Sequence, residues 1–491
     1  MDSPIFTQLI NELKLNRSSD KAIYLQLSDY ILLLIRNGLL LPHQKLPSSR
    51  ILGDILDINR ITVCRAYEEL ETQGWIESFI GKGTFISSHI PENNPDILKK
   101  PSLLSPQKQA GFSIDEKKYL TTYTSVTSKI HFDDGFPDPK LAPLHELYRS
   151  YRRQLTRHGL YDKFGSYSYP EGSEYYREAV SNYVNETRGL KTTFKNILSV
   201  RGTLMGINLV CNGLIKKGDV IVSGFPGWGR AEANFEHAGA NHMMIPVDEH
   251  GLVMNDLKKI CEKHPVRMVY VTPHHHYPTT VSMRIDRRLE LLQLSKEYGF
   301  IILEDDYDFD FHYAHRPLLP LASADENGMV IYCGSFSKSF SPAFRIGYLV
   351  ASENIIEYLS KVRLLLDRQG DHILDNAMAE ILNDGTVQRY LRKTVGVYEE
   401  RRNIFCRALK NQLGNNVEFT IPAGGMSVWV KFNSYIDLEK LAKRALKKGL
   451  YISNGNAHKY PKFNENTIRL GFASCSIEDI KEGIGILKDL M

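Results

Sequence analysis

Residues 334–338 read Gly-Ser-Phe-Ser-Lys, and Arg345 follows seven residues past the lysine. The side-chain amine of Lys338 can form an imine with an aldehyde. The hydroxyls of Ser335 and Ser337, together with the guanidinium of Arg345, can hold a phosphate group. Because pyridoxal phosphate is an aldehyde that carries a phosphate, this stretch predicts a pyridoxal phosphate site.

Further groups that this cofactor requires occur upstream. Residues 304–308 read Glu-Asp-Asp-Tyr-Asp and follow the apolar run 300–303, so they are expected just after a strand, where α/β sheets bind ligands. One of these acids would face the pyridine nitrogen and keep it protonated, and Tyr307 could hydrogen-bond the ring oxygen. Taken alone, a cluster of acids at a strand end is often only a solvated loop.

The phosphate and the ring have candidates of their own. Residues 202–205 (Gly-Thr-Leu-Met) open an apolar helix, whose free amides, including that of Leu204, can bind phosphate together with the hydroxyl of Thr203. Trp228 follows a predicted strand and could stack on the ring, although a lone tryptophan is more often a core residue. The joint occurrence of these groups on alternating elements favours the cofactor site.

Strands and helices alternate from about residue 130 onward. Short apolar runs bounded by turns occur at 220–222, 268–271, 300–303 and 330–333. Amphipathic segments lie between them, and this alternation predicts an α/β fold with a mainly parallel sheet. Beyond about residue 380, long charged helices and two strand-like pieces predict a smaller α+β subdomain.

The bulk composition is that of a globular protein with several domains. The chain has 491 residues, 42% of them hydrophobic and 24% charged, with a net charge of +4. Because no segment has the length of a membrane span or the form of a signal peptide, we expect a cytoplasmic protein without a membrane partner. The six cysteines lie far apart with no CxxC pair, so neither disulfides nor a metal site is predicted.

Residues 1–90 predict three helices followed by a hairpin, the element order of a winged helix-turn-helix. The helices are expected over 24–35, 50–56 and 60–73, and Ser48 and Asn59 are the predicted N-caps of the last two. Strands on either side of Gly81-Lys82-Gly83 would form the hairpin. Residues 91–128, which contain four prolines and many polar residues, predict an exposed linker to a domain over 129–491.

The third helix presents a face that suits the major groove of DNA. Its apolar residues recur at helical spacing and leave Arg60, Thr62 and Arg65 on the outer face, where arginine can read guanine or clamp phosphate. Arg50 and Lys82 are further candidates for phosphate or minor-groove contacts. Residues 1–90 hold 9 Lys and Arg against 10 Asp and Glu, so charge alone favours a solvated face. The order of elements favours DNA binding.

These N-terminal motifs resemble the GntR family of bacterial winged-helix repressors. The stretches that carry the resemblance are 46–50 (Leu-Pro-Ser-Ser-Arg), 59–70, 74–77 and 81–85. The resemblance implies that operator DNA is contacted by Arg50, Arg60, Thr62 and the wing around Gly81, and the candidate set also includes Ser48, Arg65 and Lys82. Many family members have a run of alanines where this chain has Leu52-Gly53, which we interpret as a packing variation.

Residues 271–350 resemble fold type I aminotransferases. The motifs are Thr272-Pro273 with Tyr277-Pro278, then 304–308, then 335–339 with 345–348. They are most similar to the aminotransferase-like half of the MocR/GabR-type subfamily of GntR transcriptional regulators. With the winged helix, the resemblance runs from about residue 20 to the C-terminus. It implies a PLP-dependent aminotransferase fold over 129–491, with its small C-terminal subdomain over about 380–491.

The resemblance also implies roles for individual residues. Lys338 would be the Schiff-base lysine, and Asp305 would pair with the pyridine nitrogen, with Asp306 as the fallback. The phosphate would be held by Ser335, Ser337, Arg345 and Thr203, and the ring would be contacted by Trp228, Tyr277 and Tyr307. An amino-acid carboxylate would bind Arg469, a second acidic group would bind Arg230, and Tyr167 would reach the phosphate of a partner subunit.

Two stretches depart from the family pattern. Thr279-Thr280 stands where a serine or threonine and a glycine are common, which would alter the loop beside the ring oxygen. The run 274–276 is three histidines, which cannot all face one metal from a strand end, so a structural role is favoured. Contact of one of them with the cofactor stays open.

Three functions would use this pocket. A transcriptional regulator would sense an amino acid or related amine, through an external aldimine that displaces Lys338 and is anchored at Arg469. An aminotransferase with an autoregulatory DNA-binding module would turn the amine over, and a sensor of pyridoxal phosphate itself would switch when Lys338 is occupied. The intact helix-turn-helix favours the regulator, with residual aminotransferase activity left open. The resemblance further implies a homodimer, in which the winged helices could be exchanged between subunits.

Overall fold

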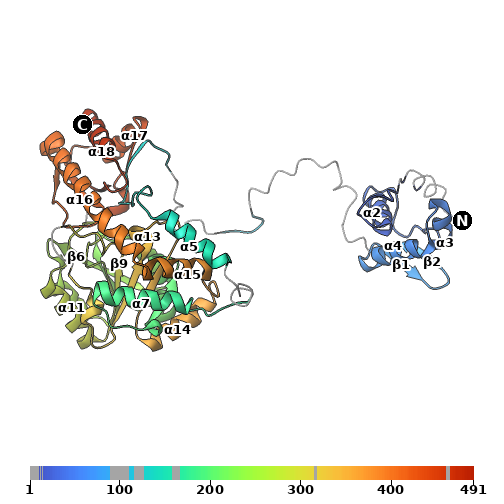
Figure 1. Cartoon of the computed structure of the whole chain (residues 1–491), viewed down its shortest axis with the longest axis horizontal. Helices are drawn as coiled ribbons and strands as arrows, with labels where there is room; N and C mark the ends of the chain where they lie inside the picture. The colour runs from blue at the N-terminus through green and yellow to red at the C-terminus, as the bar shows by residue number, and fades with distance from the viewer. Residues whose placement is uncertain are drawn as a thin grey trace. The chain divides into compact units, whose positions relative to one another are not determined.

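The computed structural model divides into two compact units, Met1–Asp115 and Glu116–Met491 (Figure 1). The residues that it describes are 10, 13, 15–88, 110–114, 126–156, 166–313, 318–460 and 465–491. The division falls inside the predicted linker 91–128, of which residues 91–109 and 115–125 lie outside the described residues.

In its described part, the N-terminal unit contains the predicted order of three helices and a hairpin. The elements are α2 (Ile23–Arg36), α3 (Ser49–Leu56), α4 (Arg60–Thr72), β1 (Ile76–Phe79) and β2 (Gly83–Ile86). The Ser48 hydroxyl accepts a hydrogen bond from the Ile51 amide and caps α3, and the Asn59 side chain caps α4 through the Ile61 amide. Both predicted N-caps are confirmed.

The core of the N-terminal unit forms where α4 packs against α2 and α3. Val63, Ala66 and Leu70 are buried, as their helical spacing predicts. The hydroxyl of Tyr67 donates to the carbonyl of Pro47 at 2.9 Å, which ties α4 to the turn before α3. The opposite face of α4 is therefore left to solvent or to a partner.

Packing explains why this chain has Leu52-Gly53 where many GntR proteins have alanines. Leu52 is fully buried in the core of the unit. A Cβ atom at Gly53 would lie 3.0 Å from the carbonyl oxygen of Ile58, so the glycine lets α3 approach the turn that leads into α4.

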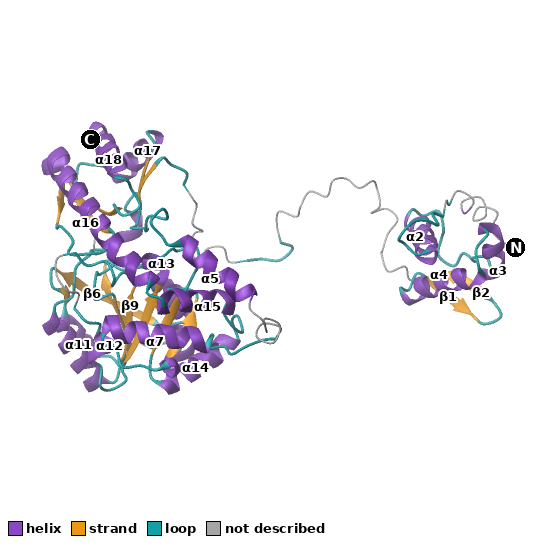
Figure 2. Cartoon of the chain, viewed as in Figure 1, coloured by secondary structure: helices purple, strands orange, loops and turns teal. Residues whose placement is uncertain are grey.

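An eight-stranded sheet forms the centre of the C-terminal unit (Figure 2). In spatial order its strands are β4 (Ile197–Val200), β11 (Gly347–Val350), β10 (Val330–Ser335), β9 (Ile301–Asp306), β8 (Val266–Val271), β5 (Val220–Phe225), β6 (Asn241–Asp248) and β7 (Gly251–Leu252). The five strands from β10 to β6 run parallel, whereas β11 and β7 pair antiparallel with their neighbours. The mainly parallel sheet is therefore confirmed.

Helices cover both faces of this sheet, because alternate residues of its central strands point to opposite sides. Ile221 and Leu303 pack with α8 (Thr203–Leu214), α9 (Gly229–His237) and α14 (Glu353–Leu364). Their chain neighbours Val222 and Ile302 pack with α10 (Met254–Cys261) and α11 (Ile285–Tyr298). Further helices are α5 (Leu144–Thr156), α7 (Glu174–Arg188), α12 (Leu321–Ala324) and α15 (His372–Asn383).

The chain beyond α15 forms a smaller α+β part. Its elements are α16 (Thr386–Leu413), β12 (Val417–Phe419), β13 (Ser427–Phe432), α17 (Leu438–Lys447), β14 (Leu450–Ile452), β15 (Thr467–Gly471) and α18 (Ile477–Leu490). β13 lies between β12 and β15 in an antiparallel sheet. β14 pairs in parallel with β3 (Ile130–Phe132), so a segment from the beginning of this unit joins the smaller part, which the sequence did not indicate.

One predicted boundary is wrong in a way that matters for the site. β9 continues through Asp306, so Glu304, Asp305 and Asp306 lie within the strand instead of after it. All three acids are buried. Glu304 is accommodated there because it accepts hydrogen bonds from the backbone amides of Leu321 and Ala322 at 2.9 and 3.0 Å.

Within the described residues, no helix combines the length and the apolar character needed to cross a membrane.

Candidate functional site

Lys338 lies on α13 (Phe336–Ser339), the short helix that directly follows β10. The Ser335 hydroxyl caps this helix by accepting a hydrogen bond from the Ser337 amide at 3.0 Å, and it donates to the Ser337 hydroxyl at 2.9 Å. This cap fixes the sharp strand-to-helix turn. The turn holds the lysine at the carboxyl edge of the parallel strands, where α/β sheets bind ligands.

Arg345 links the two serines to the start of α8. Its Nη1 donates to the Ser337 hydroxyl at 3.2 Å, and its Nη2 donates to the carbonyl of Arg201 at 2.8 Å. Gly202 has a φ of +77°, and a Cβ atom there would lie 2.5 Å from Nη2 of Arg345, so only glycine lets the guanidinium approach. The residues thus gathered, with the first free amides of α8, are the predicted phosphate ligands Ser335, Ser337, Arg345, Thr203 and Leu204.

Asp305 is a buried carboxylate with one unsatisfied oxygen. Its Oδ2 accepts a hydrogen bond from the hydroxyl of Tyr270 at 2.8 Å, whereas its Oδ1 has no hydrogen-bond partner among the described residues. Burial raises the pKa of Asp305 to about 7, although the bond from Tyr270 opposes the shift. A protonated ring nitrogen would supply both the missing donor and the missing positive charge, so this carboxylate fits pyridoxal phosphate.

Asp306, the second candidate for the pyridine nitrogen, already has partners within the protein. Alternation along β9 turns it to the other face, where its Oδ2 accepts from the Tyr332 hydroxyl and its Oδ1 forms an ion pair with His274 at 3.3 Å. Burial acts to raise the pKa of Asp306, but the charge of His274 and these contacts outweigh burial and lower the pKa to about 2. Asp306 therefore serves the packing of the strand, and Asp305 is the carboxylate with a free position.

Asp305→Asn is expected to weaken retention of the cofactor at least about tenfold, because asparagine keeps the bond from Tyr270 but loses the charge that holds a protonated nitrogen. Asp306→Asn is the matched comparison and should instead destabilise the fold by roughly 3–5 kcal/mol, since it leaves a buried His274 without its counter-charge. Absorbance after dialysis and thermal unfolding separate the two effects. Equal cofactor retention by Asp305→Asn and the natural protein would contradict the assignment.

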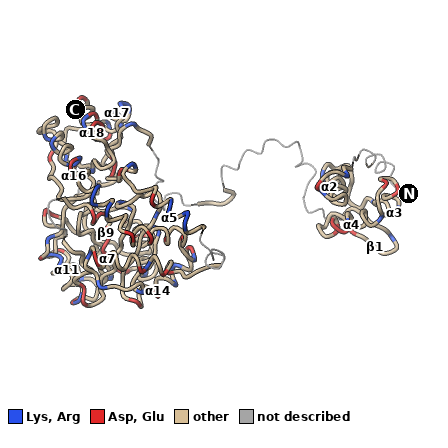
Figure 3. The backbone as a smooth tube through the Cα atoms, viewed as in Figure 1, with Lys and Arg blue, Asp and Glu red and all other residues tan. Residues whose placement is uncertain are grey.

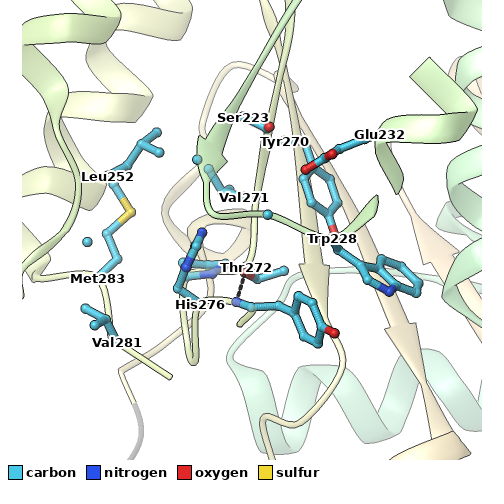
Figure 4. Close-up of a pocket in the computed structure, with 15 residues that line it drawn as sticks. Ser223, Trp228, Glu232, Leu252, Tyr270, Val271, Thr272, His276, Val281 and Met283 are labelled. Carbon is cyan, nitrogen blue, oxygen red and sulfur yellow. Dashed lines mark hydrogen bonds between the residues drawn. The ribbon is translucent and has the colours of Figure 1, made fainter. Parts of the chain in front are cut away.

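Trp228 and Tyr277 lie beside each other at the same edge of the sheet, with ring centroids 6.3 Å apart. Trp228 precedes α9, and the Tyr277 amide donates to the Thr272 hydroxyl at 3.0 Å. Figure 4 shows a pocket here, with Trp228 and Tyr270 on one side and Leu252, Val281 and Met283 on the other. Trp228 is half-buried, so its indole is not fully enclosed by the described residues.

Arg469, in the middle of β15, is 3% exposed in its side chain. Its Nη1 donates to the Pro278 carbonyl at 3.0 Å, its Nη2 lies 3.4 Å from the Tyr307 hydroxyl, and its Nε lies 3.1 Å from a carboxylate oxygen of Asp134. Burial acts to lower the pKa of Arg469, but Tyr307, Asp134 and Tyr277 together raise it above its usual range. The structure therefore holds a charged guanidinium at a buried position.

Lys338 reaches the same site from the other side. Its Nζ donates to the Gly135 carbonyl at 2.6 Å and lies 4.5 Å from the centre of the Phe136 ring. Burial lowers the pKa of Lys338, and the charge of Arg469 acts in the same direction, whereas Asp134 and Asp133 oppose it. A lowered pKa favours the neutral amine, which is the nucleophilic form.

The loop beside Tyr277 retains a left-handed residue although it lacks the glycine. Thr280 has a φ of +63°, a conformation that is strained for a β-branched residue. The three histidines before it have separate partners: His274 bonds Leu318 and pairs with Asp306, His275 bonds Asp308, and His276 bonds Thr279. Among the described residues, no group of three or more His, Cys, Asp or Glu could hold a metal ion.

Two predicted site residues stand apart from this cluster. The side chain of Arg230 is exposed and makes no ion pair with the described residues. Tyr167 is 72% exposed, and its ring lies against Arg368 at 4.1 Å. The effector role of Arg230 and the reach of Tyr167 to a partner subunit stay predictions.

The structure adds three participants that the sequence did not indicate, namely Tyr270, Asp134 and the Gly135-Phe136 turn. Tyr270 could have been noticed in the sequence, because it and Arg267 are the two side chains of β8 that carry a polar group. Asp134 offers no such signal, because its partner Arg469 lies at the other end of the unit in the sequence.

The candidate DNA-binding residues lie on the exposed face of the N-terminal unit. Arg60, at the start of α4, places its Nε 3.3 Å from the Ser49 hydroxyl. None of the basic side chains Arg50, Arg60, Arg65 and Lys82 forms an ion pair with the described residues, and all four are exposed. Figure 3 shows acidic and basic residues interspersed in this unit. Binding to DNA would therefore depend on where individual basic side chains lie more than on the net charge of the unit. Ile61, 64% exposed beside Thr62, is an apolar group on this face that the sequence analysis did not include.

Comparisons with known proteins agree with both units. The family of bacterial regulatory proteins, gntR family, matches residues 23–86, and aminotransferase class I and II matches residues 138–487. The uncharacterized HTH-type transcriptional regulator YdfD of Bacillus subtilis is 30% identical over 466 residues, which are 94% of each chain. The probable rhizopine catabolism regulatory protein MocR of Rhizobium meliloti is 26% identical over 97% of this chain and 95% of its own.

Solved structures match the C-terminal unit. Multiple substrate aminotransferase from Thermococcus profundus has 28% identity and a TM-score of 0.69, covering 74% of this chain and 91% of its own. LysN, an alpha-aminoadipate aminotransferase from Thermus thermophilus, has 26% identity and a TM-score of 0.68 with the same coverage. The chain therefore belongs to the MocR-type transcriptional regulators, in which a GntR helix-turn-helix domain is fused to a class I and II aminotransferase domain.

Proposed function

We propose that this regulator holds pyridoxal phosphate at Lys338 and changes its binding to operator DNA when an amino acid or related amine occupies the site at Arg469. The observation that carries the proposal is that adjacent residues contact both groups: Asp134 lies 3.1 Å from Nε of Arg469, and the Gly135 carbonyl accepts a hydrogen bond from Nζ of Lys338 at 2.6 Å. A reactive amine beside a buried anion receptor suits a ligand that has both an amino and a carboxylate group.

When bound, the cofactor supplies an aldehyde that reacts reversibly with amines and a ring that withdraws electrons. The chain's own residues would orient it. Asp305 would accept a hydrogen bond from the protonated ring nitrogen through its unsatisfied Oδ1, and Trp228 would lie on the ring. Ser335, Ser337 and Arg345 would bind the phosphate together with the first amides of α8.

On the effector side, Arg469 would bind the ligand's carboxylate. Its guanidinium is held in place by the Pro278 carbonyl and the Tyr307 hydroxyl, so it need not reorganise when the ligand arrives. Burial excludes water and strengthens the attraction between the two charges. A ligand amine would then meet Lys338 and the cofactor while its carboxylate is anchored.

A homodimer is part of the proposal. Large apolar side chains are exposed on residues 166–169 and at the end of α14, and the Ser168 amide donates to the side chain of Gln369, in the loop that follows α14, at 2.6 Å. The exposed residues are Tyr167, Tyr169, Leu364, Leu365 and Leu366. Exposed apolar side chains of this size support association with a second subunit, which would place two helix-turn-helix units on repeated half-sites.

Arg469→Ala is expected to weaken the response to an amino-acid effector by roughly 100-fold while the visible absorption of bound cofactor persists, because loss of a buried charged partner costs about 2–5 kcal/mol. The measurement is a titration of the purified holo-protein with L-amino acids and amines, read by absorbance and by operator binding. Arg444→Ala removes an exposed arginine of α17 and is the control. An unchanged response in Arg469→Ala would contradict the role of this residue.

The same titration tests the competing function. Two of the solved structures with which the C-terminal unit aligns are named as aminotransferases, so turnover is the natural alternative. Conversion of the cofactor to its amine form by a stoichiometric amino donor would indicate an enzyme. A stable spectral change accompanied by altered operator binding would support the regulator.

A further inference from the structure

The anion receptor at Arg469 already holds a carboxylate that belongs to the chain. Asp134 places Oδ1 3.1 Å from Nε of Arg469, and its Oδ2 accepts a hydrogen bond from the Tyr277 hydroxyl at 2.9 Å. The next residues contact the lysine, through the Gly135 carbonyl and the Phe136 ring. One short segment thus covers both groups that the proposed effector would use.

The contact between Asp134 and Arg469 is asymmetric. The Arg469 side chain is 3% exposed and the Asp134 side chain is 44% exposed. A buried guanidinium needs a counter-charge, whereas a half-exposed carboxylate can return to water at little cost. Moreover, the Nε–H of Arg469 is not aligned for a hydrogen bond to any described residue, so the pair is Coulombic and not a bidentate clamp.

The segment that carries Asp134 is fixed at its two ends. Asp133 accepts hydrogen bonds from the Gly135 and Phe136 amides at 2.9 and 3.0 Å, and its own carbonyl accepts from the Gly471 amide at 2.6 Å. Asp138 forms an ion pair with Arg401 at 2.9 Å. Between these two ends, the carboxylate of Asp134 contacts Arg469 and Tyr277, and the carbonyl of Gly135 accepts the hydrogen bond from Lys338.

There is room for this segment to move. A cleft of about 450 Å³ lies beside it, and its lining includes Asp133, Phe136, Pro137 and Pro139 of the segment, together with Ser341 and Ala343 beyond α13. Because one side of the segment borders the site and another side borders this cleft, the segment is not enclosed in close-packed core.

We propose that Asp134 is a built-in competitor for the effector's carboxylate, occupying the receptor at Arg469 until an amino acid displaces it. This inference rests on the proposed function and deepens it, because it selects effectors that carry a carboxylate over plain amines. The exchange replaces one carboxylate by another, so the charge around Arg469 stays balanced while Asp134 turns to solvent. A ligand carboxylate that aligns with the guanidinium gains hydrogen bonds that Asp134 lacks.

Displacement would act on the part of the chain that leads to the DNA-binding unit. Asp134 follows β3, whose Ile130 is close in sequence to the predicted linker 91–128. β3 is held to the smaller part by its pairing with β14, by a hydrogen bond from the Cys475 thiol to the His131 carbonyl and by core contacts such as that of Phe132 with Phe405, at 5.0 Å between ring centroids. Release of Asp134 therefore changes the contacts of the segment that directly follows this linker.

The test compares the holo-protein with its Asp134→Asn variant, which keeps the size of the side chain and removes its charge. Each of the common L-amino acids and the primary amine formed by its decarboxylation are titrated, with absorbance and tryptophan fluorescence as readouts. The half-saturating concentration of a responding amino acid should fall at least tenfold in the variant, whereas that of the matching amine should change less than twofold. Asp286→Asn breaks an exposed pair with Arg284 and is the control.

Stability and DNA binding give independent readouts of the same variant. Without a ligand, Asp134→Asn should melt at a lower temperature than the natural protein, because Arg469 loses its counter-charge, and the responding amino acid should restore the difference. Its operator affinity without ligand should match that of the natural protein saturated with the amino acid. Asp134→Ala should behave in the same direction and serves if the asparagine variant does not fold.

The outcomes separate this inference from the proposed function. If the natural protein responds to amino acids and Asp134→Asn responds within twofold of it, the competitor role is wrong and the proposed function stands. If an amine responds and Asp134→Asn loses that response, Asp134 recognises a cation and the competitor role is again wrong. If neither protein responds to any compound, both proposals are overturned.

Discussion

Lys338→Ala is expected to abolish the visible absorption of the purified protein completely. The amine of Lys338 is the group on α13 that can bond covalently to the aldehyde, and its lowered pKa raises the fraction of neutral, nucleophilic amine. Alanine removes the amine and also the hydrogen bond to the Gly135 carbonyl. Absorbance spectra and borohydride reduction followed by mass spectrometry measure the loss.

Two controls sharpen this expectation. Lys296→Ala removes an exposed lysine of α11 and should leave the spectrum unchanged. Thermal unfolding shows whether Lys338→Ala still folds, which is expected because the Ser335 cap of α13 is made to a backbone amide and does not involve the lysine side chain. A coloured Lys338→Ala protein with reducible cofactor would refute the pocket assignment.

Arg60→Ala and Arg65→Ala should each weaken operator binding by about tenfold to a hundredfold, because each well-placed base or phosphate contact is worth roughly 1–3 kcal/mol. Both side chains are exposed on α4 and form no ion pair with the described residues, so they are available to DNA. Cofactor absorption should be unchanged, since the cofactor candidates all lie in the other unit. Fluorescence anisotropy with operator DNA measures the affinity.

Salt dependence separates base reading from phosphate binding. If Arg65 contacts a phosphate, the slope of log affinity against log salt should fall by about 0.9 in Arg65→Ala, and a base contact should instead relax sequence preference. Lys21→Ala removes a positive charge near α2, where Lys21 pairs with Asp29, and controls for net charge. Unchanged affinity in both arginine variants would refute the major-groove model.

The secondary structure of this protein could be predicted closely from its sequence. The limits of α3 and α4 follow from Ser48 and Asn59, whose side chains bond amides within the next three residues. β13 (Ser427–Phe432) lies beyond residue 380, where strand-like pieces are expected, because alternation and apolar content are properties of the strand itself. Such local features do not depend on where the rest of the chain lies.

The candidate site could be predicted only in part. Sequence named both Asp305 and Asp306 but could not choose by physical argument, because neighbours in a strand point to opposite faces and only packing decides which face has a free position. The structure supplies Tyr332 and His274 as partners of Asp306, and leaves Oδ1 of Asp305 unsatisfied. The strand also proved longer than its apolar run, because buried partners make acidic residues acceptable there.

By itself, the sequence determined the kinds of element, their order and the chemical groups available, since caps, periodicity and motifs act over a few residues. The tertiary structure alone decided which of these groups meet. Asp134 and Arg469 are brought together because β14 pairs with β3 and because the Asp133 carbonyl accepts a hydrogen bond from the Gly471 amide, at the end of β15. Contacts between residues far apart in the chain depend on the packing of whole elements, and no local pattern encodes them.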